Sequence, residues 1–135
     1  MTLKRWREGS FEIVTQDGQM LVNGFVSGEF GIRDAGGRRP VWTVTHLASG
    51  TLVTPGTAGF HQIEMAMAFA DRIAALADWS RIDRQAPGRE LGFQVMVIWN
   101  ELIVLDMAKV ITDCYGVSAH AVRMKPKPSR SRSSA

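Results

Sequence analysis

The sequence predicts an α+β fold: a curved antiparallel sheet of about four strands, followed by two helices packed on one face of the sheet. Three observations lead to this prediction. Between residues 10 and 54, short runs rich in β-branched and aromatic side chains alternate with glycine-containing turns. After Pro55, apolar residues recur at helical spacing over two long stretches. Residues 123–135 are basic and nearly free of apolar side chains, which is typical of a disordered tail.

The expected strands are residues 10–15, 20–30, 41–47 and 51–54. The first ends at Asp17-Gly18, a dipeptide typical of hairpin turns. The second contains Gly24 and Gly28, which predict either one curved strand or two short ones. With Gly31, these glycines also resemble a phosphate-binding loop. They lie in apolar, strand-like sequence without the Lys-Ser/Thr ending of such loops, so we interpret them as points where the sheet curves.

The second half of the chain predicts helices. Residues 61–78 are rich in alanine and free of proline and glycine, which favours a helix, and a polar linker should follow from 78 to 88. Residues 89–115 are ambiguous, because 93–98 and 102–105 could each be a buried strand. Length and continuity favour one helix, capped by Gly116. Its inward stripe would be Leu91, Val95, Ile98, Leu102 and Leu105. The expected core is Trp42, Val44, Phe69, Ile73 and Leu76.

The charge distribution predicts a single domain at residues 1–122 and a separate tail at 123–135. The tail holds five of the sixteen Lys and Arg residues and none of the thirteen acids, so a body of −2 carries a tail of +5. Such a tail is typical of proteins that bind polyanions, most commonly nucleic acid. The longest apolar run is far shorter than the ~20 residues of a membrane span, so no membrane association is expected. The single cysteine, Cys114, fits a cytoplasmic protein.

Catalytic and metal-binding patterns are weak. His46 could act as a base, but the sequence offers no residue to orient its ring, so we expect it to cap its strand by hydrogen bonding to the Ala48-Ser49-Gly50 turn instead. His61, His120 and Cys114 lack the spacing of a metal site, and no metal or cofactor is expected. An enzyme is therefore the least favoured class.

Two groups of residues remain as candidates for binding. The first group is cationic, and Trp6 within it offers a surface on which a base could stack. The alternative interpretation of this group is ordinary, solubilising surface charge. Its members are Lys4, Arg5, Trp6, Arg7, Arg38, Arg39, Arg123, Lys125, Lys127, Arg130 and Arg132. The second is aromatic, and we interpret it as core rather than as a base-stacking surface. Its members are Phe25, Phe30, Trp42, Trp79 and Trp99.

These observations support two hypotheses of function. The first is a small, non-enzymatic accessory protein that binds DNA or RNA through the basic tail and the cationic surface. The second is a protein-interaction module, an inhibitor or adaptor of a larger nucleoprotein complex, that uses a helix face or a strand edge.

Overall fold

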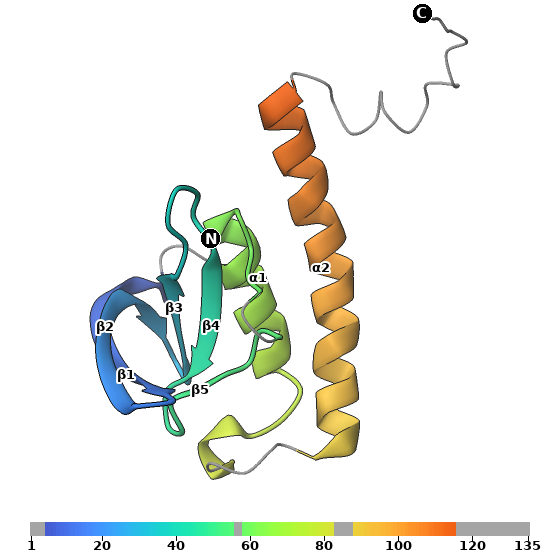
Figure 1. Ribbon diagram of the computed structural model, residues 1–135. Coiled ribbons are helices and arrows are strands. Elements are labelled where there is room, and N and C mark those ends of the chain that lie inside the picture. Colours follow the sequence, from blue (N-terminus) through green and yellow to red (C-terminus); the bar gives the residue numbers. More distant parts are fainter. Residues whose placement is uncertain (1–4, 56–57, 83–87, 116–135) are drawn as a thin grey trace, which may run out of the picture.

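The computed structural model describes residues 5–55, 58–82 and 88–115, with side chains to residue 112 (Figure 1). The predicted tail, its five cations and the Gly116 cap lie outside these residues. Five strands are followed by two α-helices with a short 3-10 helix between them, which confirms the α+β class. The elements are β1 (Arg7–Thr15), β2 (Gly18–Ser27), β3 (Phe30–Asp34), β4 (Trp42–His46), β5 (Thr51–Leu52), α1 (Ile63–Ala74), η2 (Trp79–Arg81) and α2 (Arg89–Tyr115).

The five strands form one antiparallel sheet in chain order, each paired with its neighbours in sequence. The segment that contains Gly24 and Gly28 is divided, because the chain turns at Gly28 with a φ of 60°. β2 therefore ends before this glycine and β3 begins after it, which is the second of the two predicted alternatives.

The sheet is strongly curved, as expected from its glycines. A Cβ at Gly24 would lie 2.0 Å from the backbone oxygen of Ile32, so only glycine permits β2 to approach β3 this closely. At the far end of the curve, the Val14 N–H donates to the Gly50 carbonyl at 2.9 Å, which brings β1 against the turn before β5. These glycines thus serve the curvature of the sheet, and they do not precede a helix as those of a phosphate loop do.

The main core lies between the sheet and α1. Phe30, Ile32 and Val44 of the sheet pack against Phe69 and Ile73 of α1. Of the five predicted core residues, three are fully buried, namely Val44, Phe69 and Ile73. Trp42 and Leu76 are partly buried against the same cluster. The predicted core residues are therefore confirmed at the centre of the cluster, while the two at its edge are less buried than predicted.

α1 ends four residues earlier than predicted, and the segment after it is not simply a polar linker. Trp79 of η2 is 3% exposed, and its indole Nε1–H donates to the carbonyl of Ile73 at 2.8 Å. Its ring meets that of Phe30 edge to face, with centroids 5.1 Å apart. The chain therefore folds back after α1 in order to bury this tryptophan.

α2 is one continuous helix of 27 residues, about 40 Å long. The strand alternative for residues 93–105 is therefore excluded. α2 lies on the same side of the sheet as α1, in contact with α1 (Figure 1). Trp99 packs against Phe60 and Phe69, with ring centroids 4.7 and 5.9 Å away. In the described part of the chain, no helix is long and apolar enough to cross a membrane.

Asp106 of α2 supplies the N-terminal cap of α1. Gln62, at the capping position, makes no side-chain hydrogen bond to the helix. Instead, the two carboxylate oxygens of the fully buried Asp106 accept the backbone N–H groups of His61 and Gln62, each at 2.8 Å. These N–H groups lie at the N-cap and directly before it, beside the positive end of the helix dipole of α1, so a carboxylate is well suited to this position.

Candidate interaction surface

The predicted cations that the structure describes are divided between two regions. Arg5 precedes β1 and forms an ion pair with Asp71 of α1, with 3.1 Å between Nη2 and Oδ1. Burial raises the pKa of Asp71, and the Arg5 guanidinium opposes this rise. Arg7 is exposed at the start of β1. Trp6 is 6% exposed and belongs to the core, so its indole ring is not available there as a stacking surface for a base.

Arg38 and Arg39 are exposed in the loop between β3 and β4. This loop is held in shape by Asp34, whose Oδ1 accepts the backbone N–H groups of Gly36 and Val41 at 2.9 and 3.0 Å. The remaining predicted residues lie outside the described part of the chain, namely Lys4, Arg123, Lys125, Lys127, Arg130 and Arg132. In the aromatic group, Phe30, Trp79 and Trp99 are buried while Phe25 and Trp42 pack against the core, as the core interpretation expects.

His46 is 2% exposed, and both of its ring nitrogens are hydrogen-bonded. Nε2 donates to the carbonyl of Trp79 at 2.9 Å, since a carbonyl can only accept. In the neutral ring, Nδ1 then accepts the hydroxyl of Ser49, also at 2.9 Å. His46 thus bonds the turn after β4, as predicted. It also joins this turn to η2, a contact across 33 residues that no sequence pattern indicated.

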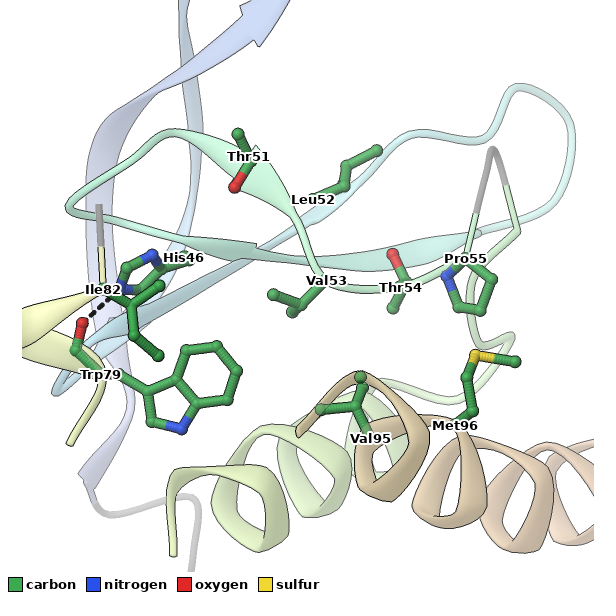
Figure 2. Close-up of a pocket in the computed structure, with 11 residues that line it drawn as sticks. His46, Thr51, Leu52, Val53, Thr54, Pro55, Trp79, Ile82, Val95 and Met96 are labelled. Atoms are coloured by element: carbon green, nitrogen blue, oxygen red, sulfur yellow. Dashed lines mark hydrogen bonds between the residues drawn. The ribbon is translucent and has the colours of Figure 1, made fainter. Parts of the chain in front are cut away.

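A pocket of about 310 Å³ lies beside His46, bounded by the chain after β4, by η2 and by the first turns of α2. Figure 2 shows Val53 facing Val95, with Trp79 and Ile82 at one end of the pocket. Two of the polar side chains on its wall are engaged, because His46 bonds Trp79 and Ser49 and the Thr51 hydroxyl bonds Ser49 at 2.7 Å. The buried hydroxyl of Thr54, which also lines the pocket, has no hydrogen-bond partner among the described residues. The wall is otherwise mainly apolar, so the pocket can accept an apolar group, but a single hydroxyl does not make a catalytic site.

Besides the pocket, a second candidate binding surface is the side of α2 that faces away from the body. Its inward side carries Val95, Ile98, Trp99 and Leu102, each at most 7% exposed. Val104 follows Val95 by nine residues, about two and a half helical turns, so it lies on the opposite side of the helix. Val104 is accordingly 66% exposed, although it is as apolar as the residues of the buried side.

This outward side forms a continuous row, which we call the outer face of α2. Its apolar members are 37% to 69% exposed, and Asn100 in the middle is also exposed. The row repeats with a spacing of 4-3-4-3-4, the seam of helices that pair with other helices. The outer face consists of Phe93, Val97, Asn100, Val104, Met107 and Ile111.

The same repeat is visible in the sequence beside the predicted inward stripe. Of the predicted stripe, Leu91, Val95, Ile98 and Leu102 do face the body, but Leu105 is 54% exposed. The inward position of that turn is taken by Asp106, the cap of α1. Two apolar rows at heptad spacing on one helix indicate that the helix has a second apolar surface besides the buried one.

Comparison of the chain with protein-family models, with curated proteins and with solved structures finds no match. The function of the protein therefore has to be inferred from its own residues. Among the described residues, the outer face of α2 is a continuous apolar row that the packing of the body does not use.

Proposed function

We propose that this protein is a protein-interaction module, an adaptor or inhibitor of a larger complex, and that the outer face of α2 is its binding surface. The observation that carries the proposal is the exposure of five large apolar side chains along one side of a helix whose other side is already buried. Val104 and Phe93 alone are 66% and 69% exposed. Monomeric proteins rarely leave a contiguous apolar patch of this kind in water, and such patches commonly mark binding sites.

The spacing of the outer face favours a helix as the partner. From Phe93 to Ile111 the row extends about 27 Å along α2. A helix that follows the same 4-3 repeat can place side chains between those of the row along this whole length. The row contains no charged residue, so the contact would be mainly apolar. Such a surface distinguishes partners by shape and spacing more than by charge.

The test is affinity capture from a cell lysate treated with nuclease, using the full chain as bait. Val104→Glu places a carboxylate in the middle of the row and should abolish capture of the partner, because the charge would be buried without a counter-ion. Gln94→Glu is the matched control, since it adds the same charge to an exposed position of α2 outside the row. A partner retained by Val104→Glu as well as by the control would contradict the proposal.

A second candidate function, binding of DNA or RNA in the cytoplasm, is supported by the charge distribution of the sequence. Five cations without any acid are concentrated in residues 123–135, against a body of net charge −2. Their attraction to phosphates would release counterions and would make affinity strongly dependent on salt. Such binding is compatible with the interaction module, because a basic segment could contact the nucleic acid of the same complex.

Titration of labelled single- and double-stranded oligonucleotides at two salt concentrations tests this second candidate. Deletion of residues 125–135 removes four cations. If all four contact duplex phosphates, the slope of log affinity against log salt should flatten by about three to four, at ~0.9 for each contact. A truncated protein with unchanged affinity and unchanged salt dependence would exclude the tail as the binding element.

A further inference from the structure

We propose that the partner of the outer face is a second copy of this chain, packed so that the two Asn100 side chains meet across a two-fold axis. The inference rests on the proposed function, since it takes the outer face as a binding surface and names what binds there. Three features of the described residues support it: the position of Asn100, the absence of charge along the row, and the placement of the body on the other side of α2.

Asn100 is the one polar member of the outer face, and it lies between Val97 and Val104. Its amide carries two donors and an acceptor, all of which lose water when the row is covered. A wholly apolar partner would leave these groups without hydrogen bonds, which is costly. In a two-fold pairing the same residue of the second copy supplies both a donor and an acceptor. A single asparagine in an otherwise apolar seam is a known means of selecting one register between paired helices.

Charge does not oppose self-association at this surface. In a two-fold interface each residue lies near its own counterpart or near residues of the same patch, so a charged row would repel itself. The row itself is uncharged. Glu101, which follows Asn100 at the edge of the row, forms an ion pair with Arg72 of α1 at 2.7 Å within its own copy.

The arrangement of the body leaves room for a second copy. The inward side of α2 contacts α1, and the helix forms one border of the molecule, with the sheet beyond α1 (Figure 1). Two copies joined through their outer faces would therefore carry their bodies on opposite sides of the helix pair. A contact along a single helix is expected to be smaller than a standard interface, which buries about 800 Å² per copy. We accordingly expect an equilibrium between monomer and dimer that depends on concentration.

Sedimentation velocity of the full chain, under reducing conditions and over a roughly micromolar to millimolar range, is the first measurement. Wild type and the control Gln94→Glu should form dimers as concentration rises. Val104→Glu should remain monomeric throughout, with an unchanged circular dichroism spectrum to show that the fold is intact. Dimers that persist in folded Val104→Glu would place the contact elsewhere and would overturn the proposal.

Disulfide trapping tests the register independently. In a Cys114→Ser background, Asn100→Cys should form a covalent dimer on mild oxidation, because the two sulfurs would lie at the axis. Gln19→Cys, on the exposed β1–β2 hairpin, is the control and should not. Equal trapping at both positions, or none at residue 100, would refute the Asn100 contact.

The outcomes separate this inference from the proposed function. A wild-type chain that is monomeric at all concentrations excludes the second copy as partner. The capture experiment can still succeed in that case, with a different helical protein retained by wild type and lost by Val104→Glu. Failure of both experiments would show that the outer face is not a binding surface.

Discussion

Replacement of Asp106 by alanine tests the inference that α2 caps α1 and so holds the two helices together. The substitution removes two hydrogen bonds of 2.8 Å and leaves the N–H groups of His61 and Gln62 without their acceptor. Bonds to a charged group contribute about 1.5–3 kcal/mol each, and loss of an ordinary N-cap costs about 1 kcal/mol. Water can reach the half-buried His61 and Gln62 and recover part of this loss. We therefore expect Asp106→Ala to lower the free energy of unfolding by about 3 kcal/mol.

The assay is urea denaturation followed by circular dichroism, in which the midpoint should fall while the m-value stays constant. Asp106→Asn keeps the shape and one acceptor oxygen, so about 1–2 kcal/mol should be lost. Glu101→Gln is the matched control on the same helix. Its side chain is 55% exposed and bonds Arg72 at the surface, so it should cost less than about 1 kcal/mol. If Asp106→Ala is no less stable than Glu101→Gln, the capping argument is refuted.

Three further predictions concern the body. Gly24→Ala should destabilise the protein by more than about 2 kcal/mol in thermal melts, because the added Cβ would lie 2.0 Å from the backbone of β3. Gly37→Ala is the control and should be near neutral, because nothing lies within 4 Å of a Cβ at that position. His46→Leu should cost about 1–3 kcal/mol, because it leaves the carbonyl of the buried Trp79 without its donor and removes one of the hydrogen bonds of Ser49. An unchanged melting temperature would contradict the structural role of His46. Arg5→Ala should raise the pKa of Asp71 further, as measured by NMR titration of the carboxyl. Since that pKa is already raised in the folded state, the stability that protonated Asp71 contributes is present below the ordinary carboxyl pKa and is lost as pH rises through the folded value.

The elements of this fold are encoded close to where they form. The turn at Asp17-Gly18, the division of the chain at Gly28 and the uninterrupted apolar spacing of residues 89–115 each depend on local chemistry. The sequence therefore predicts the hairpin turn and favours one helix over residues 89–115, while at Gly28 it leaves one curved strand and two short strands as alternatives. The curvature of the sheet could likewise be expected from its glycines, although the atoms that Gly24 approaches belong to the next strand.

The same local patterns predict the candidate surface only in part. α2 has apolar rows at heptad spacing on two opposite sides, so periodicity shows that both Val95 and Val104 belong to a row but not which row is buried. The predicted stripe passed through Leu105, while the inward position is Asp106, a residue that a helix pattern counts as polar and exposed. Trp6 was likewise expected at the surface by its basic neighbours, and the entry to β1 buries it.

The sequence by itself determined the α+β class, the order of the strands and helices, the central residues of the core and the separation of charge between body and tail, because propensity, periodicity and composition are properties of neighbouring residues. The tertiary structure alone decided which side of α2 is covered, because that depends on Phe60 and Phe69 meeting Trp99 across the chain. It alone also decided that Asp106 caps a helix 44 residues earlier and that His46 bonds Trp79. These contacts are set by where elements distant in sequence come to lie, and only the packed chain brings their atoms within reach of one another.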